Sequence, residues 1–373
     1  MTDIVIPAAL LPKDGRFGSG PAQIRREALQ ALGAAHHLMG TSHRQPPIRN
    51  LVGAIREQLR ALYAVPDGYE VVLGNGGASL FWDLATCALI ARRGAFGVCG
   101  EFSRKFAAAA AAPFLEEPVV YEVPAGAAVV PSASPDVDTY AWAQHETSTG
   151  VRTPVLRPAG IDSAALVLID ATSAAGGMTA DISATDAYYF APQKNFSSDG
   201  GLWVAYCSPA LLERAARIKA AQSRWIPPLL DLTLAVENSR KDQTYNTPAI
   251  ATLFLLEQQL RWMLDAGGLE FVVARTTQSS SHIYTWAQNN PLTTPFVTDP
   301  ALRSPVVCTI DFDATIDTQA LLRVLRANGI VDIAPYRSLG RNQLRIGVYA
   351  AVDPADVRAL TACIDYVTER LAA

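Results

Sequence analysis

Short apolar segments alternate with helical segments along the first two thirds of the chain, and this alternation limits the possible folds more than any other feature. Apolar runs occur at residues 70–73, 95–98, 119–123 and 140–143, and others follow around residues 164–169. Continuous apolar strands separated by helices are typical of a mostly parallel sheet with helices on both faces. Ligands of such sheets bind beyond the carboxyl ends of the strands. The sequence therefore predicts an α/β fold with a site at that edge.

The composition is that of a large globular protein. The 373 residues are 50% hydrophobic and 18% charged, which predicts a sizeable core and two domains. The net charge of −4 provides no general attraction for nucleic acid or acidic membranes. No uncharged apolar stretch is long enough to span a membrane, and an N-terminus with Asp3 and no basic region does not resemble a signal peptide. We expect neither a nucleic-acid nor a membrane partner.

The five cysteines are odd in number and widely spaced, and none forms a CxxC pair. Most lie in apolar surroundings, which favours buried free thiols in a reducing compartment over disulfides or zinc ligands. We therefore expect a cytoplasmic protein without a metal site.

The last third of the chain has a different pattern. A long helix at residues 248–266 ends at Gly267 and Gly268, and a polar helix follows it. The elements expected beyond it are strands at 306–310, 330–333 and 344–349 and helices at 321–327 and 354–371. This βαββα order predicts a small α+β domain. We expect a large domain of residues 16–268 and a small domain formed by residues 1–15 and 269–373.

Lys194 is a charged residue between two apolar runs, and Asp170 ends the apolar run that precedes them. Burial lowers the pKa of an ammonium group, so the free amine becomes a nucleophile near neutral pH. A nucleophilic amine close to a strand-end carboxylate is what pyridoxal 5′-phosphate requires: the lysine binds the aldehyde, and the acid keeps the pyridine nitrogen protonated. The alternative interpretation is a solvated lysine in a turn and an ordinary strand-end acid.

Further candidate residues follow the predicted strands. The glycine-rich segment at residues 73–79 precedes a helix and could bind a phosphate, although a simple turn also fits. Phe102 could stack on the pyridine ring or pack in the core. Thr147 could bond the phenolic oxygen of the cofactor or belong to a turn. Asn246 and Thr247 could bind phosphate or cap a helix.

Three segments carry candidate anion ligands. Arg44 follows His43 on a loop before a helix, and Arg337 follows Tyr336 on a loop between two expected strands. Arg345 lies inside an apolar strand. Guanidinium groups match carboxylates and phosphates. Each arginine alone is nevertheless more typical of a surface charge, and this applies least to Arg345, whose neighbours along the strand are apolar or glycine.

Taken together, residues 191–195 (Ala-Pro-Gln-Lys-Asn), 246–248 (Asn-Thr-Pro) and 42–44 (Ser-His-Arg), with Asp170, resemble the phosphoserine aminotransferase family. The resemblance covers nearly the whole chain, including Phe-Gly-Ser-Gly-Pro at residues 17–21. It implies fold type I of the class V pyridoxal-phosphate enzymes, with a mostly parallel seven-stranded sheet and a small α+β C-terminal domain. It also implies a homodimer with shared active sites.

Position by position, the resemblance implies a role for each candidate. Lys194 corresponds to the lysine that forms the Schiff base, and Asp170 to the partner of the pyridinium nitrogen. The implied cofactor ligands are Ala78, Ser79, Phe102, Thr147 and Gln193, with Asn246 and Thr247 reaching the phosphate from the other subunit. The implied substrate ligands are His43, Arg44, Tyr336, Arg337 and Arg345, with Arg345 binding the α-carboxylate.

Two positions depart from the family pattern. Many members have an arginine where Ala78 stands and a histidine where Tyr336 stands, which indicates a divergent bacterial branch. The implied reaction is amino transfer from L-glutamate to 3-phosphohydroxypyruvate in serine biosynthesis; the site is also compatible with transamination to 4-phosphohydroxythreonine in pyridoxine biosynthesis. The alternatives are a serine–glyoxylate-type aminotransferase, a cysteine desulfurase, or a pyridoxal-phosphate-binding protein without turnover.

Overall fold

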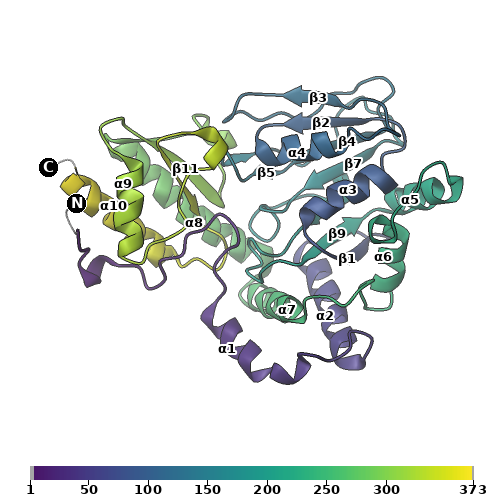
Figure 1. Cartoon of the computed structure of the whole chain (residues 1–373), viewed down its shortest axis with the longest axis horizontal. Helices are drawn as coiled ribbons and strands as arrows, with labels where there is room; N and C mark the ends of the chain where they lie inside the picture. The colour runs from purple at the N-terminus through teal and green to yellow at the C-terminus, as the bar shows by residue number, and fades with distance from the viewer. Residues whose placement is uncertain (1–3, 372–373) are drawn as a thin grey trace.

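The computed structural model describes residues 4–371, and a seven-stranded sheet forms the core of its larger part, on the right in Figure 1. Its strand order is β1-β9-β8-β7-β4-β2-β3. Only β9 runs antiparallel to its neighbours, whereas the other adjacent strands are parallel. The strands are β1 (Glu70–Asn75), β2 (Gly94–Val98), β3 (Val119–Glu122), β4 (Thr139–Ala143), β7 (Leu166–Asp170), β8 (Ala187–Phe190) and β9 (Leu202–Cys207). The expected mostly parallel sheet is confirmed.

Helices bury both faces of this sheet, which explains why its strands are apolar throughout. Along β8, Tyr188 and Phe190 point into the core under one layer of helices, whereas Tyr189 points into the core under the other. The first layer contains α2 (Pro46–Leu62) and α7 (Ile250–Asp265), with α1 (Arg26–Ala34) beside α7. The second contains α3 (Ala78–Ala88), α4 (Glu101–Ala109), α5 (Pro209–Ala221) and α6 (Leu232–Ser239).

Helix α2 illustrates how the sequence defines these elements. Prolines occupy its first two positions, where their missing N–H groups have no intrahelical acceptor to lose. Ile48, Val52, Ile55 and Leu59 then recur at helical spacing and are all buried on one face. The spacing of these apolar residues therefore accounts for the buried face of the helix.

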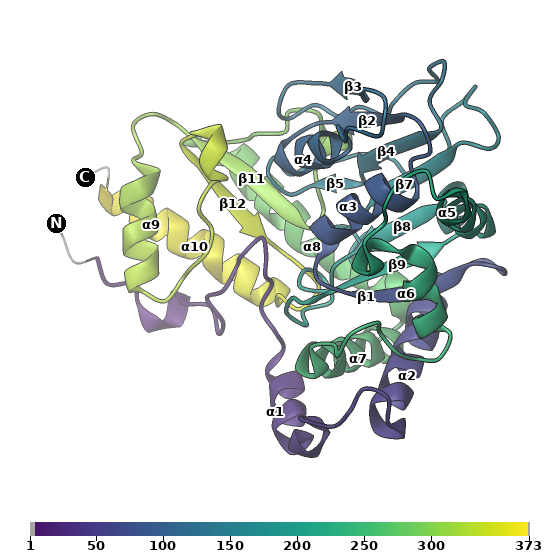
Figure 2. The same ribbon diagram turned by 45° about the vertical axis from the view of Figure 1, so that its right-hand side comes forward.

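A three-stranded antiparallel sheet forms a second core beside the first (Figure 2). Helix α8 (Gly268–Asn289) leads into it, and α9 and α10 pack on it. Its members are β10 (Thr293–Pro295), β11 (Val307–Phe312), β12 (Gln343–Gly347), α9 (Thr318–Ala327) and α10 (Pro354–Leu371). The remaining short elements are β5 (His145–Glu146), β6 (Val151–Arg152) and six single 3₁₀ turns: η1 (Ala8–Leu10), η2 (His36–Leu38), η3 (Ile182–Ala184), η4 (Pro228–Leu230), η5 (Pro300–Leu302) and η6 (Arg337–Leu339).

One of the three strands expected in this small sheet, at residues 330–333, is wrong. Residues 330–333 do not form a strand: Val331 makes a single bridge to Arg16, and Asp332 has a positive φ of 68° that interrupts the extended backbone. The third strand is instead β10, which pairs with β11. Its three residues, Thr-Thr-Pro, are too few and too polar to give a strand pattern.

The N-terminal segment packs on the C-terminal helices. The N–H of Lys13 donates to Asp356 Oδ1 (2.8 Å), and the N–H of Ile6 donates to Asn328 Oδ1 (2.9 Å). Residues 1–3 lie outside the described residues, and they include Asp3, the acidic residue that makes the N-terminus unlike a signal peptide. The exact division at residues 15/16 and 268/269 remains a prediction. No helix among residues 4–371 is long and apolar enough to cross a membrane.

Candidate active site

The two residues that carry the chemical hypothesis lie at the carboxyl edge of the large sheet. Asp170 is the last residue of β7, and Lys194 follows the neighbouring strand β8. The polar segment 144–149 follows β4 and is buried beside them: the N–H of Gln144 donates to the main-chain oxygen of Asp170 (2.9 Å). This edge is where parallel sheets bind their ligands.

The Lys194 amine is held in a closely fitted space. Its Nζ donates to the main-chain oxygen of Ser19 (2.6 Å). Gly20 has a φ of +139°, which favours glycine, and a Cβ there would lie 1.9 Å from Nζ and displace the amine. Burial, and then the charge of Arg345, lower the lysine pKa from 10.5 to about 8, against the opposing charges of Asp170 and Glu146. The group is therefore poised to exchange protons near neutral pH.

The Asp170 carboxylate is buried and fixed by two donors. Trp82 Nε1 donates to Oδ2 (3.0 Å), and the N–H of Thr172 donates to Oδ1 (2.9 Å). Burial raises the pKa of Asp170, while the hydrogen bonds from Thr172 and Trp82 act in the opposite direction. The position of the Asp170 carboxyl group is thus fixed by its donors. A cation bound beside it would lower its pKa and favour the charged carboxylate.

The segment after β4 adds residues that the sequence interpretation did not single out. Thr147 Oγ1 lies 2.7 Å from Ser173 Oγ, which lies 2.6 Å from His145 Nδ1. All three residues are buried. His145 Nε2 has no hydrogen-bond partner among the described residues. A run of polar residues directly after a buried strand was the available signal, because such groups are seldom buried without a function.

Glu146, also missed, positions the start of α4. Its carboxylate accepts from the N–H of Phe102 (3.3 Å) and from the N–H and Oγ of Ser103 (3.0 and 2.8 Å). This fixes Phe102 at the first turn of the helix. The Phe102 ring contacts the Tyr336 ring edge-on, with centroids 5.8 Å apart.

Arg345 joins the small sheet to this cluster. From β12, its Nη1 donates to the main-chain oxygen of Thr147 (3.2 Å), and its guanidinium lies over the Tyr336 ring at 5.1 Å. Its Nε is buried without a partner among the described residues. Burial lowers the Arg345 pKa. A half-buried cation with an unused, buried donor atom is suited to bind an anion.

The glycine-rich segment ends in the N-terminus of α3. The helix begins at Ala78, inside the segment 73–79 that we expected to precede it, and Gly76 before it has a φ of +105°. Ala78 is buried and Ser79 is exposed. N–H groups in a first helical turn have no intrahelical acceptor and favour anions. Gln193, another expected cofactor ligand, directly precedes Lys194. Its side-chain Oε1 is buried and has no hydrogen-bond partner among the described residues.

The remaining candidates form a second group beside β1. Asn75, the last residue of β1, accepts from the N–H of Asn246 (3.1 Å). Thr247 Oγ1 lies 3.2 Å from His43 Nδ1. Arg44 Nη1 donates to Gln243 Oε1 (2.9 Å). Burial, and then Arg44, lower the pKa of His43.

The side chains of Asn246, Thr247 and Arg44 are exposed, so this second group presents polar atoms outward at the same edge of the sheet. Arg337 is exposed in η6, and among residues 4–371 its side chain makes no hydrogen bond or ion pair. The structure does not bring Arg337 into contact with the other candidates.

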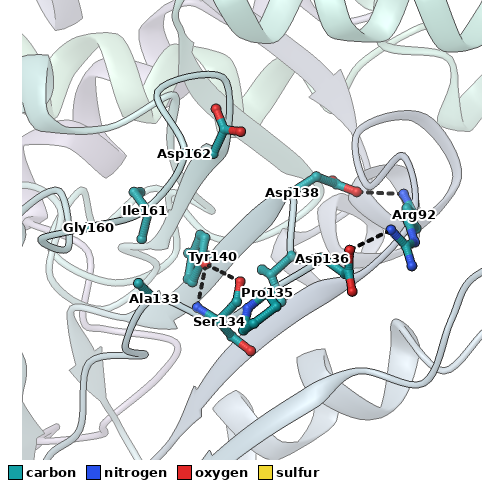
Figure 3. Close-up of a pocket in the computed structure, with 11 residues that line it drawn as sticks. Arg92, Ala133, Ser134, Pro135, Asp136, Asp138, Tyr140, Gly160, Ile161 and Asp162 are labelled. Carbon is teal, nitrogen blue, oxygen red and sulfur yellow. Dashed lines mark hydrogen bonds and ion pairs between the residues drawn. The ribbon is translucent and has the colours of Figure 1, made fainter.

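A separate hollow of about 600 Å³ lies at the opposite, amino-terminal edge of the strands (Figure 3). Its polar groups are already paired by the protein. Asp138 accepts from the N–H of Arg92 (2.6 Å) and from Arg214 Nη1 (2.9 Å), and Asp136 pairs with Arg92 (2.9 Å). These contacts tie strand ends together. Within residues 4–371, no group of three or more histidine, cysteine or acidic side chains could hold a metal ion.

Comparisons with known proteins identify relatives of the whole chain. The family model described as aminotransferase class-V matches residues 129–360. A phosphoserine aminotransferase from Nocardioides sp. is 58% identical over 375 residues, covering 100% of both chains.

Two solved structures have the same fold. The phosphoserine aminotransferase of Cytophaga hutchinsonii has a TM-score of 0.85 at 21% identity, covering 94% of this chain and 99% of that one. The phosphoserine aminotransferase of Trichomonas vaginalis with bound pyridoxal phosphate has a TM-score of 0.80 at 21% identity, covering 95% and 100%. The two sheets and their helices therefore form a known architecture.

Proposed function

The chain belongs to the class-V aminotransferase family, and we propose that it transfers an amino group from L-glutamate to 3-phosphohydroxypyruvate, giving O-phospho-L-serine and 2-oxoglutarate. The fold is that of the type I pyridoxal-phosphate enzymes. The observation that carries the proposal is the convergence of Lys194, Asp170 and Arg345 at one edge of the sheet, in a chain 58% identical to a phosphoserine aminotransferase.

The residues at this edge fit pyridoxal 5′-phosphate. Unpaired buried polar atoms of Gln193, His145 and Arg345 lie on the segments that surround Lys194, and the N-terminus of α3 at Ala78 and Ser79 offers N–H groups for the phosphate. Phe102 would contact the ring, and Thr147 its phenolic oxygen. When bound, the cofactor supplies an electron-accepting ring that makes amino transfer feasible.

The protein side chains would divide the remaining work. Lys194 Nζ would hold the cofactor and, once released, move a proton as general base and acid, for which a pKa of about 8 is suitable. Asp170 would hold a proton on the pyridine nitrogen through its buried carboxylate. Arg345 would bind the substrate α-carboxylate through its free Nε.

The distal anion of the substrate would be bound by His43, Arg44 and Arg337, with glutamate placing its second carboxylate in the same pocket. Tyr336, which replaces the family histidine, packs between Phe102 and Arg345. Tyr336 would therefore act by supporting Arg345 rather than by carrying charge to the phosphate. Transamination to 4-phosphohydroxythreonine is compatible with the same arrangement.

The cysteines argue against a desulfurase, which requires a reactive thiolate. Burial raises the pKa of Cys99 and Cys308 to about 12 and that of Cys363 to about 11. Burial also raises the pKa of Cys87 and Cys207. Reactive cysteines have lowered pKa values. All five thiols are free, which supports the proposed cytoplasmic location.

We also propose a homodimer in which Asn246 and Thr247 complete the partner's cofactor site. Their exposure supports this.

An absorbance-monitored half-reaction tests the function. The protein loaded with pyridoxal 5′-phosphate is mixed separately with O-phospho-L-serine, L-glutamate, L-serine and L-cysteine. We expect O-phospho-L-serine and L-glutamate to bleach the visible cofactor band, with little change from the other two. A larger rate with L-serine than with its phosphate ester would contradict the proposal.

A further inference from the structure

We propose that Tyr349 is a positioning residue that holds the main-chain oxygen of Ser19, and through it the free amine of Lys194, in place for proton transfer. The inference deepens the proposed function and rests on it, because the amine has a proton to transfer only if Lys194 holds the cofactor and is then released. The family resemblance implies no role for Tyr349.

One carbonyl oxygen accepts two hydrogen bonds at the candidate site. Lys194 Nζ donates to the main-chain oxygen of Ser19 at 2.6 Å, and the Tyr349 hydroxyl donates to the same oxygen at 2.8 Å. A carbonyl oxygen has two lone pairs, so these two donors use its full capacity. Ser19 and Tyr349 are 5% and 1% exposed, which leaves solvent little access to this oxygen. The amine therefore meets an acceptor whose second lone pair is already used.

The backbone that carries this oxygen is held from both sides. On the side of the small sheet, the N–H of Gly347, the last residue of β12, donates to the main-chain oxygen of Phe17 (2.8 Å). On the side of the large sheet, the N–H of Ala22 donates to the main-chain oxygen of Gln193 (2.8 Å). Residues 17–22 are thus tied both to β12 and to the segment that carries the lysine.

These contacts restrict the amine itself. A neutral amine acts as a base only through its single lone pair, and donating one N–H to Ser19 leaves that lone pair two staggered directions instead of three. The backbone at Gly20 lies against the amine, since a Cβ there would be 1.9 Å from Nζ. Proton transfer is sensitive to such placement, because a displacement of about 1 Å can cost about a hundredfold in rate. Ser19 and Gly20 therefore limit both the position and the rotation of the amine.

The Tyr349 hydroxyl also affects how tightly the amine holds its proton. The positive end of its O–H dipole points at the oxygen that accepts from the amine, so it makes this oxygen a weaker acceptor for an ammonium group. Loss of the hydroxyl should favour the charged amine and raise the pKa of Lys194 above the value of about 8 to which burial lowers it. Burial raises the pKa of Tyr349, so its hydroxyl stays protonated and remains a donor.

Other charged and titratable groups surround the amine, and a substitution at Tyr349 leaves them in place. They are Arg345 on β12, Asp170 on β7, and Glu146 and His145 after β4. A change in the Lys194 titration on loss of the hydroxyl is therefore attributable to the contact at Ser19.

The test is the pH dependence of amine reactivity at Lys194 in the full-length, cofactor-free protein. Trace acetic anhydride labels neutral amines, and mass spectrometry of the peptide containing Lys194 gives the labelled fraction across a pH series. We expect Tyr349→Phe to raise the Lys194 pKa by about half a unit to one unit, the effect of one lost contact between a dipole and a charge. Lys219 in the same samples is the internal standard for the reagent.

Tyr284→Phe is the matched control. Tyr284 is also buried, and its hydroxyl donates to the main-chain oxygen of Ser304 (3.0 Å) beside the core of the small sheet. Both variants lose one buried hydroxyl that donates to a main-chain oxygen, so they should lose similar stability. Only Tyr349→Phe should change the Lys194 titration, and equal Lys194 titrations in both variants would overturn the proposal.

A second measurement separates positioning from a general loss of stability. In the cofactor-loaded enzyme, Tyr349→Phe should lower kcat for L-glutamate about three- to tenfold with little change in KM. It should also enlarge the kinetic isotope effect of deuterium at the α-carbon, because proton transfer becomes slower. A kcat and an isotope effect equal to those of Tyr284→Phe would overturn the proposal. A wild-type Lys194 that does not bind pyridoxal 5′-phosphate would instead overturn the proposed function, whatever the labelling shows.

Discussion

At the scale of single residues, the site depends on one partly buried ammonium group. Lys194 lies against Ser19 and Gly20, and its pKa of about 8 leaves about a tenth of the amine neutral at pH 7, against about one part in three thousand at the ordinary 10.5. Asp170 and Glu146 limit the shift, because both carboxylates favour the charged amine. The sequence context of Lys194 predicted this direction, but not the contribution of Arg345 from the other sheet.

The Lys194 shift predicts how stability depends on pH in the cofactor-free protein. Between pH 8 and 10.5 the unfolded chain binds more protons at this lysine than the folded chain, so the free energy of unfolding should rise with pH in that window. The rise at Lys194 should be on the order of 1–3 kcal/mol relative to Lys194→Met. Urea unfolding of both proteins at pH 8 and pH 9.5 measures it, and parallel pH profiles would show that the lysine is not shifted.

Asp170→Asn tests the acid at the end of β7. The amide can keep the Trp82 and Thr172 contacts only in part and cannot hold a proton on the pyridine nitrogen. We expect bound cofactor with kcat/KM lowered at least ten- to a hundredfold, or about 1.5–3 kcal/mol. Trp82→Phe, which removes one donor but keeps the charge, should lose less. Near-normal turnover in Asp170→Asn would reduce Asp170 to a structural acid.

At the scale of elements, the turn after β4 organises the site. Glu146 is fully buried and binds the first turn of α4, where the helix dipole favours a negative charge. The same turn carries Thr147 and His145. One short segment would thereby fix both residues that we propose to contact the cofactor, Phe102 at its ring and Thr147 at its phenolic oxygen.

Glu146→Ala should therefore destabilise the fold as well as the site. Its loss leaves the donors of Phe102, Ser103 and Ser148 buried without an acceptor, which should cost about 3 kcal/mol. Glu122→Ala is the control: its carboxylate pairs with Arg104 on the surface and should contribute less than about 1 kcal/mol. Equal losses in chemical denaturation would contradict the capping role.

The elements also show what the sequence can and cannot predict. Long apolar or periodic segments, such as β7, α2 and α10, can be predicted because the spacing of their apolar residues alone indicates a strand or a helix. Strand β10 and the bridge at Val331 do not, because both depend on partners far away in the chain. His145 and Glu146 were missed for the same reason: their burial results from β4 lying beside β7.

At the scale of the molecule, the candidate site joins two cores. The large sheet provides Lys194, Asp170 and Thr147, whereas the small sheet provides Arg345 and the loop with Tyr336. The contacts from Arg345 to Thr147 and from Tyr336 to Phe102 connect them. Relative movement of the two parts would therefore change the geometry of the carboxylate site that we propose at Arg345.

The proposed dimer predicts complementation between two inactive proteins. Lys194→Ala and an Asn246→Ala/Thr247→Ala double variant should each lose most activity. In mixed dimers one site regains every residue, so activity should return to about a quarter of the wild-type level if subunits exchange randomly and each heterodimer has one working site. No recovery after heterodimers are shown to form would mean that Asn246 and Thr247 serve their own subunit.

The most direct measurement for the whole account is the choice of amino acceptor. Wild-type protein with pyridoxal 5′-phosphate and L-glutamate is given 3-phosphohydroxypyruvate, hydroxypyruvate or glyoxylate, and the 2-oxoglutarate formed is measured. We expect kcat/KM for the phosphorylated acid to exceed the others by at least about a hundredfold, as two or more charged contacts imply. Equal rates with hydroxypyruvate or glyoxylate would contradict the phosphate assignment and favour a serine–glyoxylate-type aminotransferase.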